Sequence, residues 1–532
     1  MSLLTSITGL LCLALAPAAL AQEADYRDPD CCTSIMVSRG ASSDGSVITS
    51  HTCDSWYRTW VNLTPAATYE RDTVMNIYDG RLHTEWVDDQ TGLKVKGQIP
   101  QARQTFAYLD TAYPCVNEKQ LGMGETTITG RKELRNKQGM FYIEELQRIA
   151  LQRCTTARDA IRLMGELIEK YGYADSGECL TIADPKEVWH FEVFGEGPDK
   201  IGGVWAAVRI PDGEVGVSAN ISRISTLDLK DKDRYMASKN VFDVAKRLGY
   251  WDGKEPFKFW KAYSGKNYQG VYKAYSVREL FILNALAPSL KLNDTLEELP
   301  FSVKPERPVS ATDVMALLRQ TYEGTDLDMT RQLKVAVKQK DGKVDTIVSP
   351  KANPWMRPDE VEMLNGIRPG VVNRVRLVSV PQCAYSTVIQ LRSWLPDAVG
   401  GIVWFSMDNP GQSPRVPLFC GITDLPAIYK ICGNHRHRTD AALWHYREAN
   451  KLAAIKWGAR RESIEQGYRH FEQKGQQELP YVESRYQALL QNEGEEAARA
   501  FLTRYSADFI GATLLHWDEL ANRYWNESRF GL

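Results

Sequence analysis

Hydrophobic and polar positions follow a helical period in one central segment of the chain. Residues 140–171 carry apolar side chains every three to four positions, which predicts two amphipathic helices with a break near the sequence CTTARD. We expect the second helix to be capped by Thr155 or Thr156 and to end at Gly172, because hydroxyl side chains favour helix starts and glycine favours helix ends.

Shorter runs of β-branched and aromatic residues lie on both sides of these helices and are separated by Gly, Pro and Asp. The predicted strands are 33–37, 47–51, 178–185, 187–195, 204–213, 214–224, 374–381, 386–392 and 400–408, with further strands and loops in 60–130. Helical stretches are predicted around 236–248, 276–286 and 311–322, and almost everywhere after 434. The elements follow the order strands, helices, strands and a helical tail, and no segment repeats. This order indicates an α+β fold of antiparallel sheets covered by helices.

An apolar leader opens the chain. Residues 3–20 contain no charge and end in small residues, which is typical of a secretory signal, so we predict a signal peptide over 1–21 and a polar propeptide over 22–31. A membrane-spanning helix and a lipid anchor at Cys12 are the alternatives, and Pro17 and the large Leu11 argue against them. We therefore expect a periplasmic or secreted protein whose mature chain has no membrane span.

The charge balance and the spacing of possible metal ligands argue against a nucleic-acid-binding protein and against a metalloprotein. The net charge is only −2, with 65 basic and 67 acidic residues and no long single-sign run, so no nucleic-acid partner is expected. Ten cysteines are too few for a disulfide-built scaffold of this length. His435, His437 and His445 lack an acidic or thiol ligand at a familiar spacing, so we predict no metal and no cofactor.

Two adjacent cysteines, Cys31 and Cys32, follow the propeptide region and precede a predicted strand hairpin. A free thiol has a pKa of about 8.5 and needs a base to become a nucleophile. If the chain is cut before Cys32, the new α-amino group is such a base, since its own pKa is about 7.7 to 8.0. A structural thiol with a disulfide partner is the alternative.

The segment CTSIMVSRGASSDGS, residues 32–46, resembles the mature start of peptidase family C69, also called the U34 dipeptidases. These are N-terminal-nucleophile hydrolases related to the secernins. The resemblance places the nucleophile on Cys32 and implies a four-layer αββα sandwich over 32–433, with a helical C-terminal region over 434–532 packed on it.

Four later segments resemble the same family in the same order: GMGETT, ADPKEVWHFEVFG, VRIPDGEVGVSANISRI and SMDNPGQSPRVPLFCGITDLP, so that the likeness covers about residues 32–450. It implies that Asp54 orients the α-amino group and that Asn220 donates to the oxyanion. Glu125 would hold a substrate amine. His51 stands where the family has arginine, and Cys53 where it has glutamate; we count His51 with Glu125 as a substrate-binding residue.

The resemblance thus implies a cysteine dipeptidase that cleaves dipeptides or short peptides after propeptide removal. An acyl-amide hydrolase of the bile-salt hydrolase or penicillin V acylase type is one alternative. A non-catalytic, secernin-like protein is another. Homo-oligomerisation is left open by the sequence.

Overall fold

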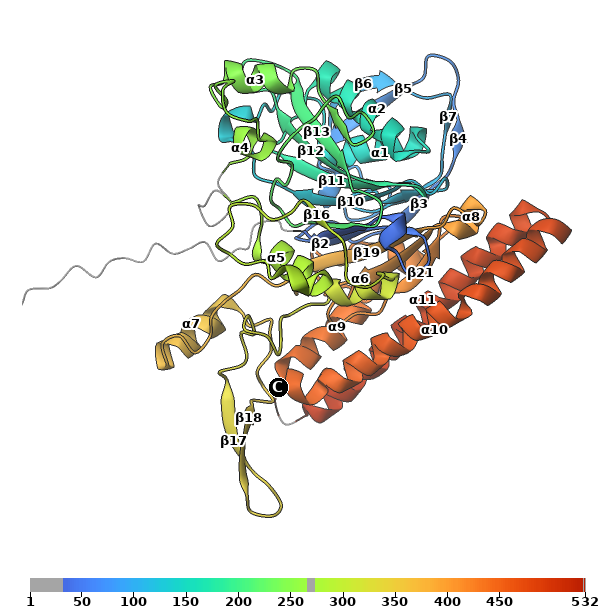
Figure 1. Cartoon of the computed structure of the whole chain (residues 1–532). Helices are drawn as coiled ribbons and strands as arrows, with labels where there is room; N and C mark the ends of the chain where they lie inside the picture. Colours follow the sequence, from blue (N-terminus) through green and yellow to red (C-terminus); the bar gives the residue numbers. More distant parts are fainter. Residues whose placement is uncertain (1–31, 266–272, 530, 532) are drawn as a thin grey trace, which may run out of the picture.

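Two antiparallel sheets packed face to face form the centre of the computed structural model (Figure 1). The structure describes residues 32–265, 273–529 and 531, so the predicted signal peptide and propeptide lie outside the described residues. Helices cover the outer face of each sheet. The predicted α+β fold with four αββα layers is therefore confirmed.

The first sheet has seven strands and contains the start of the described chain. Its strands are, in spatial order, β16 (Ser302–Val303), β14 (Val215–Ser218), β1 (Ser34–Val37), β2 (Val47–Asp54), β19 (Cys383–Leu391), β20 (Ile402–Met407) and β21 (Val416–Phe419). Every strand of this sheet except β16 is buried at every position, because the second sheet covers one side and helices cover the other.

The second sheet has eight strands. Its strands are, in spatial order, β15 (Tyr235–Ala237), β13 (Gly203–Arg209), β12 (Val188–Gly195), β11 (Glu178–Ala183), β10 (Gly122–Thr127), β9 (Val116–Asn117), β8 (Tyr108–Asp110) and β3 (Asn62–Thr64). Strands β10 and β11 contact β2 of the first sheet, which makes the interface between the sheets the main core.

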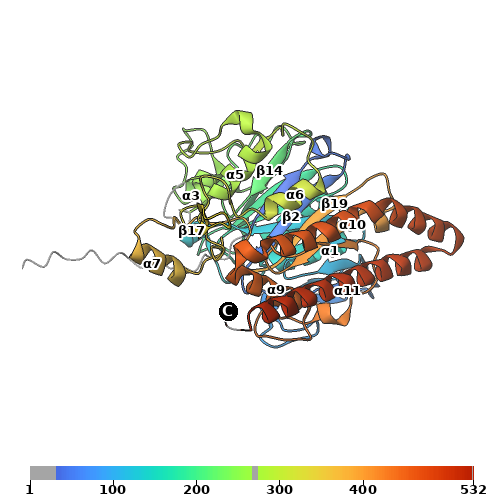
Figure 2. The same ribbon diagram turned by 90° about the horizontal axis from the view of Figure 1, so that it is seen from below.

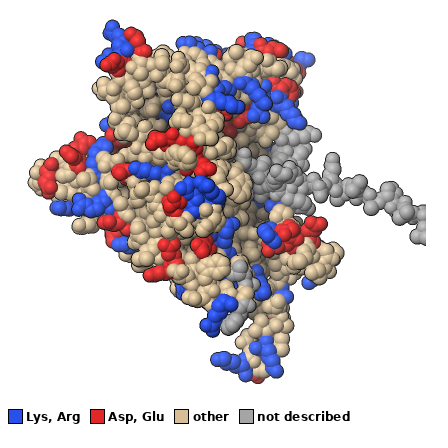
Figure 3. Space-filling model, turned by 180° about the vertical axis from the view of Figure 1, so that it is seen from behind, with Lys and Arg blue, Asp and Glu red and all other residues tan. Residues whose placement is uncertain are grey.

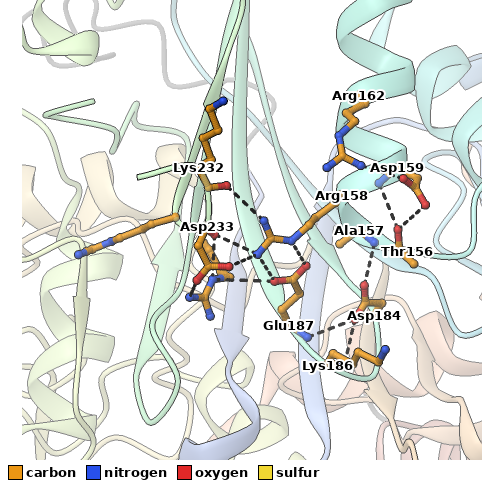
Figure 4. A network of polar contacts seen from close by, with 12 residues as sticks. Thr156, Ala157, Arg158, Asp159, Arg162, Asp184, Lys186, Glu187, Lys232 and Asp233 are labelled. Carbon is orange, nitrogen blue, oxygen red and sulfur yellow. Dashed lines mark hydrogen bonds and ion pairs between the residues drawn. The ribbon is translucent and has the colours of Figure 1, made fainter. Parts of the chain in front are cut away.

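Helices α1 (Ile143–Arg153) and α2 (Ala157–Tyr171) cover the second sheet, as the apolar period predicts. Thr156 caps α2 by accepting a hydrogen bond from the Asp159 amide at 3.2 Å, and Gly172 ends it with φ of +83°. The start of α2 is tied to the edge of the sheet by the ion pairs of Arg158 with Glu187 and Asp233, at 2.7 Å each (Figure 4).

The other face of the sandwich is covered by helices from the second half of the chain. Figure 2 shows α9, α10 and α11 lying side by side below the first sheet, where α10 and α11 contact β21. The helices of this layer are α5 (Val277–Leu286), α6 (Ala311–Leu318), α9 (Ala442–Ile455), α10 (Trp457–Asn492) and α11 (Glu495–Glu527). The helical tail expected after residue 434 is confirmed, and it packs on the sandwich.

Smaller elements decorate the sandwich, and the β17–β18 hairpin extends away from the body (Figure 1). The hairpins are β4 (Ala67–Thr68) with β7 (Gln104–Thr105), β5 (Val74–Asp79) with β6 (Lys94–Pro100), and β17 (Lys334–Lys338) with β18 (Val344–Val348). The remaining α-helices are α3 (Val241–Arg247), α4 (Phe259–Tyr263), α7 (Pro358–Ile367) and α8 (Asp397–Gly400). The 3₁₀ helices among the described residues are Arg39–Ala41, Arg81–His83, Lys132–Leu134, Pro288–Leu290 and Ala427–Lys430.

One predicted strand is wrong. Residues 374–381 form no strand and run as an irregular segment before β19. The apolar alternation in this segment buries Leu377, Val378 and Val380 without ladder pairing. The buried Arg376 side chain donates to the Leu377 carbonyl and to Asp54, so a side chain supplies contacts that a neighbouring strand would otherwise give.

Surface charge matches the balanced composition. Figure 3 shows acidic and basic side chains interspersed on one face, without a continuous field of either sign. Within the described ranges, no helix is both long enough and apolar enough to cross a bilayer.

Candidate active site

Cys32 lies at the start of the central strand β1, where three elements meet. The Thr33 amide donates to the Thr52 hydroxyl at 2.9 Å, and the Thr52 amide donates to the Thr33 carbonyl at 3.0 Å, which fixes the first residues against β2. On the other side Ser34 pairs with Ser218 of β14. Continuing this antiparallel register by two residues brings Cys32 level with Asn220.

Strand β10 approaches β2 closely because residue 124 is glycine. A Cβ atom at Gly124 would lie 2.2 Å from the Ser50 carbonyl oxygen, so only glycine permits this approach. The next residue, Glu125, is fully buried and reaches the His51 ring, with Oε2 at 3.4 Å from Nε2. In the motif GMGETT, Gly124 is therefore needed for the close packing of the two sheets, and Glu125 places a carboxylate beside His51.

Cys32, His51 and Glu125 form a compact buried group. One Sγ, one ring nitrogen and one carboxylate oxygen lie within 4.8 Å of one another. The His51 ring packs edge-on against Tyr113 and Tyr385, at centroid distances of 5.6 and 5.7 Å. Among the described residues neither ring nitrogen has a hydrogen-bond partner, although both are buried.

The ligand types of this group are those that bind zinc: thiolate, imidazole and carboxylate. A divalent ion is therefore chemically compatible with the three side chains, which sequence spacing did not indicate because they come from three separate strands or strand ends. The tail histidines do not form such a group: His445 contacts Asp518 at 2.8 Å, His437 packs on Trp444, and His435 contacts the His83 carbonyl.

Burial raises the pKa of the Cys32 thiol well above its usual value, and the nearby acidic groups Glu125, Cys53 and Asp54 raise it further. Only a hydrogen bond from the Asp54 amide acts in the opposite direction. At neutral pH the thiol is therefore protonated, and any nucleophilic role requires a base or a positive charge beside it.

Asp54 ends β2 and is held by a cation from a distant part of the chain. Its Oδ2 accepts from Thr52 Oγ1 at 2.9 Å and from Arg376 Nη2 at 3.1 Å. Both members of the Asp54–Arg376 pair are almost completely buried. Arg376 therefore fixes this carboxylate at the end of β2, close enough to Cys32 to contribute to the raised pKa of its thiol.

Arg278, the second residue of α5, connects Cys32 to Asn220. Its Nη1 donates to the Cys32 carbonyl at 2.6 Å, and its Nη2 donates to Asn220 Oδ1 at 2.8 Å. Asn220 has φ of +64°, a left-handed conformation that asparagine tolerates better than most residues, and its Nδ2 donates to the Thr127 carbonyl at 2.7 Å. The second amide hydrogen of Nδ2 is left for another acceptor.

The residues of the ASSDGS motif form a turn that supports the site without entering it. Asp44 accepts hydrogen bonds from Ser42 and Ser46, and Gly45 adopts φ of +79°. Burial raises the pKa of Asp44, but the bonds from Ser46 and Ser42 outweigh this effect and lower it overall. Gln390 of β19 donates to the same carboxylate at 2.7 Å, so the motif locks the β1–β2 connection.

The five residues singled out from the sequence therefore converge on one place: Cys32, His51, Glu125, Asp54 and Asn220. Their individual roles stay predictions. Sequence analysis missed Arg278 and Arg376, which bond to Cys32, Asn220 and Asp54. The capping box of Ser276 and Glu279 was a readable signal for the start of α5, but nothing local indicates that Arg278 turns inward.

Comparison with known proteins identifies the family. The model of peptidase family C69 matches residues 31–470, which begins one residue before Cys32. A probable dipeptidase of Latilactobacillus sakei is 24% identical over 75% of this chain and 76% of its own length. A probable dipeptidase of Salmonella dublin is 26% identical over 74% and 81%, and a probable dipeptidase B of Streptococcus pyogenes serotype M3 is 22% identical over 80% and 78%. The chain belongs to peptidase family C69.

Proposed function

We propose that this protein is a dipeptidase that uses Cys32 as an N-terminal nucleophile. The observation that carries the proposal is the buried group of Cys32, His51 and Glu125 at the start of β1, in a member of a peptidase family whose relatives are named dipeptidases. Because the thiol pKa is raised, the nucleophile needs a base close to the sulfur.

The α-amino group of Cys32 is that base once the chain begins there. The amine accepts the thiol proton while sulfur bonds to the carbonyl carbon of the scissile peptide. The tetrahedral intermediate collapses, the carbon–nitrogen bond breaks, and the same proton goes to the leaving amine. Water then attacks the thioester, transfers a proton to the α-amino group, and releases the first amino acid and the Cys32 thiol.

The surrounding residues hold the reacting groups. Asp54, paired with Arg376 at the end of β2, would orient the α-ammonium of Cys32. Asn220, fixed by Arg278, would donate its remaining amide hydrogen to the oxyanion. Glu125 would receive the ammonium group of a dipeptide, and His51 beside it would contact the same substrate residue.

Propeptide removal is tested by intact-mass spectrometry of the purified protein. We expect a mature chain that begins at Cys32, because an acylated nitrogen has no lone pair to accept a proton. The matched variant Cys31→Ala should still be processed and active. A mature, active enzyme that begins at Cys31 would contradict the mechanism.

Substrate class is tested with a panel of dipeptides, a conjugated bile acid and penicillin V. We expect hydrolysis of dipeptides and little of the acyl-amides, since the carboxylate of Glu125 favours a substrate that carries an amine. Preferential hydrolysis of an acyl-amide would reverse the assignment, and failure to hydrolyse any of them by a correctly processed chain would favour a non-catalytic role.

We also propose that residues 1–21 direct export, so that the enzyme acts in the periplasm or outside the cell. This rests on the apolar, uncharged leader and its small-residue end. Cell fractionation of the full chain and of a chain lacking 2–21 tests it: activity of the full chain in the cytoplasmic fraction would reject export.

A further inference from the structure

A cavity of about 100 Å³ adjoins the candidate active site and is not used by the proposed mechanism. Tyr113 of its wall packs on the His51 ring, and Thr127 of its wall donates to Glu125 Oε1 at 3.2 Å. Glu178 also lines it, and burial and the nearby Glu125 raise the pKa of its carboxyl group. The cavity therefore lies directly beside Glu125, the residue expected to hold the substrate amine.

The antiparallel pairing of β10 with β11 explains this arrangement. Thr127 lies directly opposite Glu178, and Glu125 is two residues from Thr127 on the same face of the strand. The two carboxyl groups are thus diagonal neighbours on one face of the sheet. Helix α1 contributes Glu144 from its first turn to the same cavity.

The wall chemistry is acidic and aromatic. Three carboxyl groups and four tyrosines line the cavity, with no lysine or arginine among the lining residues. Asp175 is paired with Arg135 at 3.2 Å on the exposed side. Within the described part of the chain, Glu144 and Glu178 form no ion pair. The lining residues are Tyr57, Leu82, Tyr113, Thr127, Tyr142, Ile143, Glu144, Tyr173, Asp175 and Glu178.

Two of the lining residues carry a polar atom without a hydrogen-bond partner. Among the described residues, the Tyr173 hydroxyl and Glu178 Oε2 have no hydrogen-bond partner, although Tyr173 is fully buried and Glu178 is only 4% exposed. Buried polar groups are normally paired, so these two atoms are available to a ligand that carries a polar or charged group. Burial and the neighbouring Glu145 raise the pKa of Glu144 to about 8, and burial together with Glu125 raises that of Glu178. Without a cation both carboxyl groups are therefore protonated at neutral pH, and a cation bound beside them favours their ionised form.

We propose that this cavity is the specificity pocket for a basic side chain, lysine or arginine, on the N-terminal residue of the dipeptide substrate. The inference rests on the proposed dipeptidase function. In a bound dipeptide the ammonium group and the side chain leave the same Cα, next to the carbonyl that Cys32 attacks. With the ammonium on Glu125, a long side chain extends past it, its apolar stem lies against the tyrosine rings, and its cation meets Glu178 and Glu144.

The direct test compares lysyl-alanine with norleucyl-alanine, which has a similar stem without the charge. We expect the wild-type kcat/KM to favour lysyl-alanine by about tenfold or more, since a charge-assisted contact is made only by lysine. Glu178→Gln and Glu144→Gln should each reduce that preference. Glu144→Gln is the cleaner variant because Glu144 does not contact Glu125, whereas a change at Glu178 can also disturb the ammonium site.

Glu166→Gln is the matched control, because Glu166 is exposed on α2 and its replacement removes one charge outside the cavity. It should leave the preference unchanged. Equal kcat/KM for the two dipeptides, or an equal loss on both substrates in Glu144→Gln, would overturn the specificity pocket while leaving the dipeptidase function intact.

A binding measurement separates the pocket from catalysis. Calorimetry of the purified protein with free lysine and with norleucine, the first products of the two dipeptides, should show lysine binding about tenfold more tightly, and Glu144→Gln should remove the difference. Lysine selectivity without hydrolysis of any dipeptide would retain the pocket and reject the enzyme function. Equal binding of lysine and norleucine would reject the pocket.

Discussion

Two buried Cys–His–Glu groups lie in the described part of the chain, and they differ in how their polar atoms are bonded. In the group of the second sheet, Cys179 lies 3.5 Å from a ring nitrogen of His190, and His190 Nε2 lies 2.7 Å from Glu192. Glu192 also accepts from the Ser222 hydroxyl and from the amides of Arg223 and Ile224. Its carboxylate therefore anchors the segment that follows β14.

The group at Cys32 has the same residue types, but within the part that the structure describes its histidine forms no hydrogen bonds of the kind that join His190 to Glu192. Both His51 nitrogens are without a hydrogen-bond partner in the described ranges, and a cavity begins at its Tyr113 neighbour. Satisfied buried polar networks stabilise a fold, whereas unsatisfied groups beside a cavity are available to a ligand. The comparison teaches that residue types alone do not show whether a buried Cys–His–Glu group is bonded within the fold or is open to a ligand.

The largest expected difference between the two groups is in catalysis. Cys32→Ala should lower kcat/KM by about 10⁴-fold or more, since removal of a nucleophile eliminates the covalent route. Cys179→Ala should keep kcat/KM within about threefold and lower stability by about 1–2 kcal/mol, because a small buried side chain is truncated. Dipeptide kinetics and urea unfolding of both variants measure this, and comparable activity losses would remove the distinction.

The free energy of unfolding should depend more on the Cys179 group than on the Cys32 group. Glu192→Gln leaves four donors around a neutral amide, so we expect the free energy of unfolding to fall by about 3–5 kcal/mol. Glu125→Gln, the matched change in the first group, should lower it by less than about 1 kcal/mol while reducing kcat/KM. Urea unfolding of the two variants decides this, and equal losses of stability would make the first group structural too.

Asn220 tests the oxyanion role with a smaller expected effect. Asn220→Gly removes the amide and accepts φ of +64° without strain, so the protein should fold. We expect kcat to fall on the order of 10²-fold, the cost of one lost oxyanion donor. A kcat close to that of the wild type in Asn220→Gly would exclude Asn220 from the site.

The smallest expected effect concerns metals. Three ligand types surround Cys32, but the proposed mechanism takes its base from the α-amino group, so EDTA should leave dipeptide hydrolysis unchanged. Activity lost in EDTA and restored by zinc would show that the Cys32 group works through a metal ion. Chelation should not affect the Cys179 group, whose histidine and carboxylate already bond to each other.

The spacing of apolar side chains predicted the helices and strands correctly wherever one face of the element packs on the core. The helices of 140–171, the Thr156 cap and the strands around β1, β2, β11 and β12 follow directly from spacing and turn residues. The predicted strand at 374–381 is wrong because the alternation there reflects burial around Arg376 and not sheet pairing.

The site was predicted only through family resemblance, because its geometry depends on contacts between residues far apart in the sequence. Glu125 reaches His51 because Gly124 allows two sheets to approach, and Arg278 reaches Cys32 across 246 positions. The sequence likewise gives no sign that Cys179 belongs to a second Cys–His–Glu group, because the β11–β12 register places Cys179 opposite Glu192.

The Arg278 bridge has a consequence for the mobility of the chain end. A terminal residue ordinarily frays, and immobilising its backbone costs roughly 1–2 kcal/mol of conformational entropy. In an enzyme that begins at Cys32, the end of the chain is also the reacting group, and fraying would dilute it among unproductive orientations. Arg278 bonds to the Cys32 carbonyl and to Asn220 Oδ1, so it holds the two residues in one orientation to each other. If they act as the proposed nucleophile and oxyanion donor, this restraint reduces the entropy lost on reaching the reactive geometry.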